Sequence, residues 1–349
     1  MKVIYSFNKQ GYEADYWTRE ISAASDERCT FIPFNHDPYV PLARYLRAQL
    51  LDDLFYAKHE GLLRMYRDVQ ELIARTGADA LLVDNCFPYH PEFLRTLDVY
   101  KVLRTTDGPA SAYDRDFAYV HAYDHVLYHS PAHNEYLGMA EKLRYVGAKR
   151  IDFWPLALFD IAFVPQRSVD ELLAQERDID VVFIGAFHFD KMPLLARLKK
   201  ALGRRFVHRG IGSWKRKVYY NVMHGFPGWV RPAAFEEVVP LYQRAKIGIN
   251  VHVRGDYTVG NYRLFDLPAN GVMQISDGGE YLNEFFEVGK EIVRHRNDDL
   301  LDRIVHYLEH DDERNAIARA GWERVMRDHR FALRMRQGAA MIEQGMAAR

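Results

Sequence analysis

The chain has 349 residues, 48% of them hydrophobic and 27% charged, which is enough for two domains of about 150–180 residues with full cores. Its 47 basic and 48 acidic residues nearly cancel, which argues against a global field that attracts nucleic acid or an anionic membrane and leaves room only for a local basic patch. The two cysteines, Cys29 and Cys86, have no metal-ligand spacing, so a disulfide framework and a zinc site are not expected.

The start of the chain, MKVIYSF, is typical of a strand and lacks the charged and then apolar pattern of a signal peptide. No run of about 18 apolar residues is present, so the sequence predicts no transmembrane segment. We therefore expect a soluble cytoplasmic protein.

The first half alternates short apolar strands with helical patterns. This alternation predicts a parallel sheet covered by helices on both faces. The predicted strands are Lys2–Phe7, Cys29–Phe34, Ala80–Val83, Lys101–Arg104 and His125–Tyr128. The predicted helices are Tyr16–Ala24, Leu42–Arg75 with Gly61 as the candidate break, a short helix from Pro91, and Ala132–Leu143.

The polar stretch Phe159–Arg177 has no strong pattern and is predicted to link two domains. After it the alternation resumes. The predicted strands are Asp180–Gly185, Arg205–His208, Ile247–Val251 and Val272–Ile275, and the predicted helices are Lys191–Leu202, Ala234–Ala245, Asp298–Glu309, Asp311–His329 and Phe331–Gly345. Residues Gly210–Pro232 are predicted to be irregular, with Trp214 and Trp229 interpreted as core residues and base stacking as the alternative.

The stretch Lys246–Asp277 predicts a strand, a loop, a helix and a second strand. In open α/β sheets, ligands bind outside the carboxyl ends of the strands, where helix N-termini present free N–H groups. Asn261 and Arg263 stand at this point, and they suit an anionic ligand such as a diphosphate.

The same stretch also resembles a family. Its motif residues are Asn250, His252, Asn261, Arg263, Phe265, Ala269, Gly271, Asp277, Phe285, Phe286, Gly289 and Glu291. This order is similar to that of the CgeB-type (spore maturation) glycosyltransferase-like group, and the first half resembles the group through Asp107, Tyr123, Asp124 and the Trp154-Pro155 segment. One departure is Asp266, which stands where the wider superfamily usually has glutamate.

The resemblance implies an α/β fold of the GT-B type, with two Rossmann-like domains and a cleft between them. Residues 1–160 would bind the acceptor, and residues 161–330 a nucleotide-activated sugar. Residues 331–349 would form a C-terminal helix that crosses back to the first domain.

The candidate donor-binding residues lie in the second half: Gly185, His188, Lys191, Asn250, His252, Asn261, Arg263 and Asp266. Lys191 opens a helix where the family often has a basic residue, and its alternative is a solvated lysine. Arg263 is interpreted as a diphosphate ligand, and its alternative is an ion pair with Asp256 or Asp266. The alternative for Asn250, His252 and Asn261 is hydrogen bonding within the loop.

The candidate catalytic residues lie in the first half. Asp107 at a strand end would accept the acceptor's proton, and its alternative is a turn aspartate before Gly108. His90 would be a wall of the acceptor pocket or a packed histidine.

The sequence therefore predicts a glycosyltransferase that moves a sugar from a nucleotide-sugar donor to an unidentified acceptor, which could be a glycan, a protein, a small molecule or nucleic acid. No DxD motif beside an apolar strand is present, so we expect no metal and no further cofactor. Two alternatives stay open: a sugar-nucleotide epimerase or hydrolase on the same fold, and a non-catalytic nucleotide-sugar-binding protein.

Overall fold

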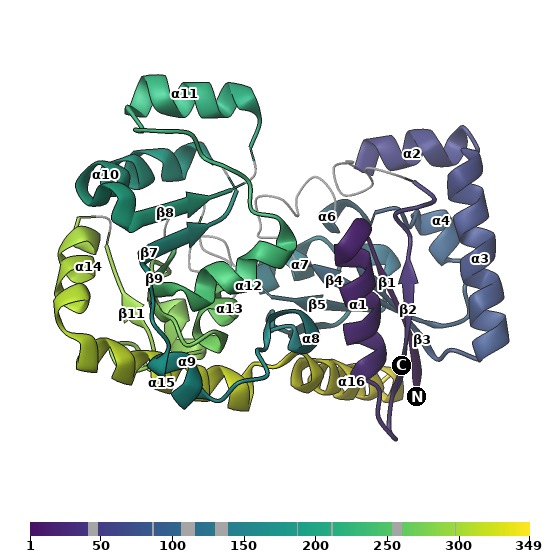
Figure 1. Ribbon diagram of the computed structural model, residues 1–349. Coiled ribbons are helices and arrows are strands. Elements are labelled where there is room, and N and C mark those ends of the chain that lie inside the picture. The colour runs from purple at the N-terminus through teal and green to yellow at the C-terminus, as the bar shows by residue number, and fades with distance from the viewer. Residues whose placement is uncertain are drawn as a thin grey trace. The chain divides into compact units, whose positions relative to one another are not determined.

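The computed structural model describes residues 1–40, 48–85, 87–105, 116–129, 139–186, 188–210, 212–252, 260–296 and 298–349. The chain divides into two compact units (Figure 1). Unit 1 consists of Met1–Ala162 and Phe331–Arg349, and unit 2 of Phe163–Arg330. Unit 1 is thus built from both ends of the chain.

Unit 1 is formed around a parallel sheet with the strand order β2-β1-β3-β4-β5-β6. The strands are β1 (Lys2–Phe7), β2 (Thr30–Asn35), β3 (Ala80–Asp84), β4 (Tyr100–Thr105), β5 (His125–Tyr128) and β6 (Ile151–Phe153). The helices are α1 (Gly11–Ala23), α2 (Ala48–Tyr56), α3 (Glu60–Thr76), α4 (Pro91–Leu94), α6 (Asp116–Tyr119), α7 (Met139–Tyr145), α8 (Asp160–Phe163, at the boundary) and α16 (Phe331–Ala347).

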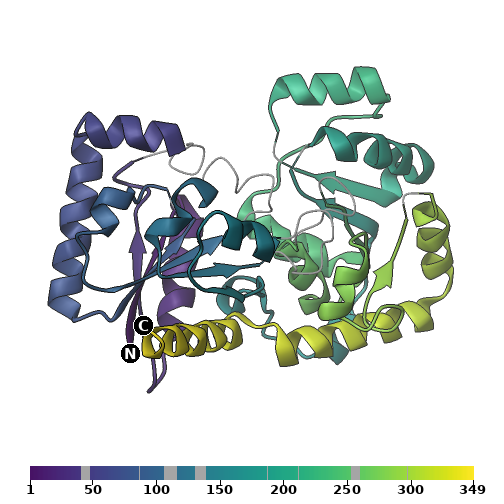
Figure 2. The ribbon, with the colours of Figure 1, turned by 180° about the vertical axis from the view of Figure 1, so that it is seen from behind.

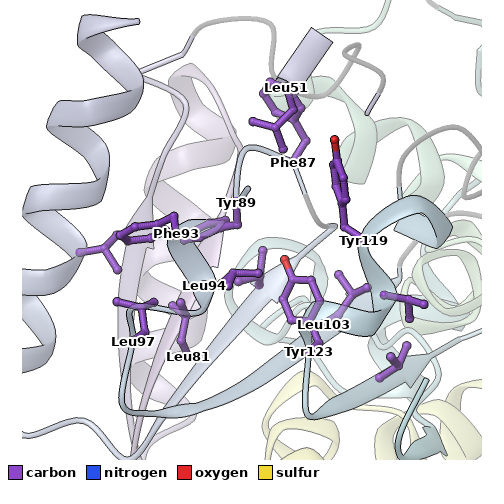
Figure 3. Close-up of a cluster of buried hydrophobic side chains, with 14 of the residues drawn as sticks. Leu51, Leu81, Phe87, Tyr89, Phe93, Leu94, Leu97, Leu103, Tyr119 and Tyr123 are labelled. Carbon is purple, nitrogen blue, oxygen red and sulfur yellow. The ribbon is translucent and has the colours of Figure 1, made fainter. Parts of the chain in front are cut away.

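Helices cover both faces of this sheet because successive strand residues point to opposite sides. On one face, Ile4 of β1 and Leu81 of β3 join a cluster with α3 and α4, where Tyr66 and Phe93 stack at 3.7 Å. Figure 3 shows this cluster, with Phe93 and Leu94 of α4 beside Leu81.

The other face is covered by α1 and α16. Tyr5 of β1 meets Trp17 of α1 edge-on, and Trp17 packs on Phe159, which stacks on Phe331 at the start of α16. Trp154 donates its Nε1–H to the carbonyl of Arg334 at 2.6 Å. The two termini lie side by side in both views (Figures 1 and 2). The last helix is therefore an integral part of the core of unit 1.

Unit 2 is formed around a second parallel sheet with the order β11-β10-β9-β7-β8. Its strands are β7 (Ile179–Ile184), β8 (Phe206–Arg209), β9 (Ala245–Asn250), β10 (Met273–Ser276) and β11 (Val293–Arg294). Its helices are α9 (Val169–Ala174), α10 (Met192–Leu202), α11 (Trp214–His224), α12 (Phe235–Gln243), α13 (Arg263–Ala269), α14 (Leu300–Glu309) and α15 (Asp311–Asp328). Phe183 packs with α10 and α14, whereas its neighbour Val182 packs with α12 and α13, so the two helix layers cover opposite faces.

Two local predictions are wrong. Residues Gly210–Pro232 contain α11, which Ser213 caps by accepting a hydrogen bond from Arg216 N–H at 3.3 Å. The predicted helix Leu42–Arg75 is interrupted at residues 57–59, where Lys58 has a φ of 54°, and not at Gly61, which lies inside α3. The predicted linker Phe159–Arg177 contains the boundary between the two units, together with α8 and the capped helix α9.

Candidate functional site

The strand order of unit 2 has a topological switch point between β7 and β9. From β7 the chain moves outward to β8 and then returns to the other side of β7 to form β9. Connections therefore leave in opposite directions at the carboxyl ends of these two strands, where open parallel sheets bind their ligands. Gly185 follows β7, and Asn250 is the last residue of β9.

Arg263, the first residue of α13, connects the two sides of the switch point. Its Nε donates to the carbonyl of Ile184 at 2.7 Å, and its Nη1 donates to Oδ1 of Asn250 at 2.9 Å. The guanidinium also lies over the ring of Phe183, 4.7 Å from its centroid. A guanidinium held at both strand ends is pre-organised to receive an anion with its remaining donors.

The sequence offers Asp256 and Asp266 as alternative partners of Arg263. Asp256 lies outside the described residues, and Asp266 acts on Arg263 as a nearby charge that opposes the lowering of its pKa by burial. Tyr242 and Asp277 oppose that shift as well. The arginine is thus a desolvated cation whose hydrogen bonds to the two strand ends go to neutral acceptors.

Gly185 is required by this close approach. A Cβ atom at Gly185 would lie 2.4 Å from Nη2 of Arg263 and 3.0 Å from the ring of Phe183. Because real Cβ contacts are longer than this, any other residue would displace the guanidinium.

Lys191 brings a second cation to the same ring. It directly precedes α10, is only 6% exposed, and places its Nζ 5.7 Å from the centroid of Phe183. Burial and then the charge of Arg263 lower the pKa of Lys191 to about 7, against the weaker opposing effects of Asp277 and Asp190. Two cations that repel each other beside a helix N-terminus form an arrangement that an anion would stabilise.

Asn250 and Asn261 hold Arg263 in place. Oδ1 of Asn250 accepts from Nδ2 of Asn261 at 2.9 Å as well as from Arg263, and Oδ1 of Asn261 accepts from Leu264 N–H at 3.2 Å. Asn250 is fully buried, and its Nδ2 has no hydrogen-bond partner among the described residues. Asn261 therefore makes hydrogen bonds within the loop, as its alternative interpretation expects. Asn250 still has an unused N–H donor that could bind a ligand.

A histidine–aspartate pair lies at the next strand ends. The carboxylate of Asp277, just after β10, accepts from the backbone N–H of His252 at 3.1 and 3.0 Å and lies 2.5 Å from Nδ1 of its ring. Nε2 of His252 is buried with no partner in the part of the chain that the structure describes. Burial would raise the pKa of Asp277, but the hydrogen bonds and charge of His252 outweigh it and hold the pKa below its ordinary value.

The remaining predicted site residues are placed differently. Asp266 is 5% exposed, and burial raises its pKa well above the ordinary value against the opposing charge of Arg263. His188 is exposed, and its carbonyl accepts from Lys191 N–H at 3.1 Å. Asp107, the predicted base, lies outside the described residues.

His90 is the packed histidine of the two alternatives. It caps α4, where Nδ1 accepts from Glu92 N–H at 3.2 Å, and its Nε2 lies 3.1 Å from Asp52. The ring stacks on Phe55 at 3.8 Å and is 3% exposed. Both ring nitrogens lie within hydrogen-bonding distance of these partners, and a role of His90 in the acceptor site stays a prediction.

The sequence alone assigns no role to two residues of this site, Phe183 and Asp277. Phe183 belongs to an apolar strand pattern that indicates only burial, although its ring lies under both cations. Asp277 is a motif residue, and its position directly after a predicted strand is the signal that it faces the same edge as His252.

Residues 191–340 match the model of a family described as glycosyl transferase-like. No curated protein matches the chain in sequence. Sucrose-phosphate synthase from Thermosynechococcus elongatus has a similar structure, with a TM-score of 0.65 at 15% identity over 100% of both chains. HepE from Anabaena, solved in complex with UDP and glucose, has a TM-score of 0.60 at 10% identity over 99% of this chain and 100% of that one.

The fold is GT-B. A further similar structure is a protein from Listeria monocytogenes provisionally assigned as a UDP-N-acetylglucosamine 2-epimerase, with a TM-score of 0.52 at 13% identity over 91% of each chain. These structures show the fold, and the match to the glycosyl transferase-like family covers residues 191–340. The predicted class of two Rossmann-like α/β domains is confirmed, and within the described residues no helix is long and apolar enough to cross a bilayer.

Proposed function

We propose that the protein transfers a sugar from a nucleotide-activated donor to an acceptor and holds the donor's diphosphate at the switch point of unit 2. The observation that carries this proposal is the placement of Arg263, bonded to the ends of β7 and β9 with Lys191 beside it. A planar guanidinium next to an ammonium group suits the adjacent oxygens of a diphosphate.

These cations match the charge that develops during transfer. The bond between the anomeric carbon and the diphosphate breaks, a bond to the acceptor's nucleophile forms, and negative charge accumulates on the leaving phosphate. Arg263 and Lys191 would stabilise that charge electrostatically, so the proposal requires no metal ion. The acceptor's proton would pass to a base, for which Asp107 stays the prediction.

Finer points belong to the same proposal. UDP is the first nucleotide to test, because the similar structure of HepE holds UDP and glucose. The motif residues around Asn250, Arg263 and Asp277 favour the CgeB-type group within the glycosyltransferase-like proteins. The proposal keeps a cytoplasmic location, and it leaves the acceptor open among a glycan, a protein, a small molecule and nucleic acid.

A sugar-nucleotide epimerase is the second candidate. The His252–Asp277 pair favours it, because an imidazole oriented through Nδ1 presents Nε2 for proton transfer. Incubation with a panel of nucleotide sugars separates the candidates. Nucleotide release that requires an acceptor extract supports transfer, turnover without acceptor supports an epimerase or hydrolase, and binding without turnover supports a non-catalytic protein.

The site itself is tested by calorimetric titration of UDP into the full chain. Arg263→Ala removes a charge-assisted interaction with phosphate, worth about 1.5–3 kcal/mol, so UDP affinity should fall roughly tenfold or more. Lys246→Ala is the matched control, because Lys246 lies at the amino end of β9 and pairs with Asp180 at 2.8 Å. Equal affinities of the parent and the Arg263 variant would refute the proposed site.

A further inference from the structure

Helix α11 of unit 2 turns its apolar side chains outward. Trp214, Val218 and Val222 are 65%, 41% and 72% exposed, and Met223 is 61% exposed. Residues at i, i+4 and i+8 follow one stripe along a helix, so these side chains form a continuous outer face. The inner side of α11 has Tyr220 as its buried residue. α11 lies at the outer margin of unit 2 in both views (Figures 1 and 2).

The segment around this face is strongly basic. From Met192 through Phe235 the sequence has ten lysines and arginines and no aspartate or glutamate, although the whole chain has a net charge of −1. Lys215, Arg216 and Lys217 lie on α11 itself. The charge is therefore concentrated on the elements that surround the exposed apolar stripe.

A basic pocket lies beside α11. It has a volume of about 280 Å³ and is lined by Lys199, Arg204, Arg209 and the half-exposed Trp229, among others. Tyr220 of α11 stacks on Phe226, which also lines the pocket, with ring centroids 4.3 Å apart. The ammonium of Lys217 lies 5.3 Å from the Trp229 ring. Lys217 of α11 thus reaches the rim of the pocket at Trp229.

We propose that α11 and the adjacent basic pocket bind the surface of an anionic lipid bilayer. An exposed apolar stripe of Trp, Val and Met beside lysines and arginines is the composition of a helix that lies in the plane of the bilayer interface. The apolar side chains enter the acyl boundary, and the basic residues contact lipid phosphates. The proposal goes beyond glycosyl transfer and does not depend on it.

Other occupants fit this surface less well. Nucleic acid would meet the basic residues, but Val218, Val222 and Met223 offer neither stacking planes nor hydrogen bonds to bases. A second copy of the chain docked on the same face would bring two basic surfaces together. Anionic lipid satisfies both the apolar and the charged parts of the face.

Vesicle co-sedimentation of the full chain tests the proposal. The parent should bind vesicles of phosphatidylcholine with about 30% phosphatidylglycerol at least tenfold better than vesicles of phosphatidylcholine alone, and 0.5 M salt should weaken this binding. Val222→Glu should lower the partition coefficient about tenfold or more, because a side chain that enters the interface becomes charged. Val305→Glu is the matched control, because Val305 on α14 of the same unit is 41% exposed and lies outside this face.

Several outcomes would overturn the proposal. They are equal binding to neutral and anionic vesicles, equal loss in the Val222 and Val305 variants, and release of bound protein by 5 mM inorganic phosphate at constant ionic strength. The last would assign the basic pocket to free phosphate. Dimers in solution that Val222→Glu dissociates, without vesicle binding by the parent, would assign the face to a second copy. Equal melting temperatures of the two variants confirm that both fold.

Discussion

Gly185 is the smallest residue of the site, and its lack of a side chain determines where Arg263 lies. Gly185→Ala would place a Cβ 2.4 Å from Nη2 of Arg263. The guanidinium is the far end of a flexible side chain, so it moves rather than the backbone. We expect UDP affinity to fall about tenfold, with a stability loss of about 1 kcal/mol or less.

Gly248→Ala separates this effect from general strain. Gly248 lies on β9, and the three atoms nearest to a Cβ there all belong to Leu267, with Cδ2 at 2.4 Å, so Arg263 is not among the groups that it displaces directly. This variant should lose stability and keep its UDP affinity. Calorimetry and thermal melting of both variants check the contrast, and unchanged affinity in Gly185→Ala would mean that the position of Arg263 does not control binding.

Lys191 combines a cost in stability with a role in anion binding. Its folded pKa of about 7 lies below the ordinary 10.5, so the unfolded chain binds more protons between these values. The unfolding free energy of the parent therefore rises as the pH increases from 7 towards 10.5. Lys191→Met removes the buried charge, so the variant should be more stable than the parent below pH 7, with the gap narrowing at higher pH.

The same substitution should weaken UDP binding about tenfold at pH 6, where Lys191 is charged. The ratio of parent to variant affinity should shrink as the pH rises from 7 to 9, and using the ratio cancels the titration of UDP itself. Calorimetric titrations and melting curves at pH 6, 7, 8 and 9 measure both effects. A variant that is less stable than the parent at pH 6 would contradict the buried-charge assignment.

At the scale of elements, periodicity predicts the parts of the chain that are buried in a regular way. The apolar strands and the amphipathic helix α3 stand close to their predicted positions because burial enforces the pattern that the sequence shows. Helix α11 escapes prediction because its apolar residues point outward, so they do not mark a core-facing stripe. The cap at Ser213 and Gly225 in the left-handed region are the local signals that mark its two ends.

The sequence likewise predicts only part of the site. A strand end followed by a helix N-terminus indicates Arg263 and Lys191, because this geometry is set by the order of the elements. The partners of these residues are not predictable, since Ile184 and Phe183 meet Arg263 only after 79 and 80 residues of intervening chain are folded. Burial of Asp266 is likewise invisible in the sequence, because a charged residue in an amphipathic segment is expected at the surface.

The ends of β9 and β10 are held together by Asp277. Its carboxylate accepts from both the backbone and the ring of His252, and its pKa is held low by these contacts. Asp277→Asn should lower the unfolding free energy at pH 7 by about 1–3 kcal/mol. This contribution is present above the unfolded pKa of aspartate and is lost as the pH falls through the lower folded value, so the difference between the two proteins should shrink as the pH becomes acidic.

Urea denaturation of the parent and the variant at pH 7, 5 and 3 measures this convergence. Asp328→Asn on α15 is the control, because Asp328 is a more exposed aspartate whose pKa is lowered by neighbouring arginines. Its effect should be below about 1 kcal/mol at every pH, since exposed pairs contribute little. A difference for Asp277→Asn that grows towards low pH would contradict the proposed role of its carboxylate.

At the scale of the whole molecule, both the first and the last residues of the sequence belong to unit 1. Unit 1 needs its last helix, because Trp154 packs against Gly338, where a Cβ would lie 2.7 Å from the indole, and donates to the Arg334 carbonyl. Residues 1–162 alone would expose this indole and Phe159. Unit 2 is continuous in sequence and has its own core of β7, β9 and β10 with α10 and α14.

This asymmetry leads to a prediction about where the donor binds. Residues 163–330 expressed alone should fold and bind UDP, with an affinity within about tenfold of the full chain, because Gly185, Lys191 and Arg263 all lie in this unit. Unit 1, produced as residues 1–162 together with a 331–349 peptide, should not bind UDP. Calorimetry on both, with Arg263→Ala in the unit 2 fragment as the negative control, decides the question. A folded unit 2 fragment that does not bind UDP, beside a unit 1 complex that does, would reverse the assignment of donor and acceptor domains and leave the two cations at the switch point without a nucleotide ligand.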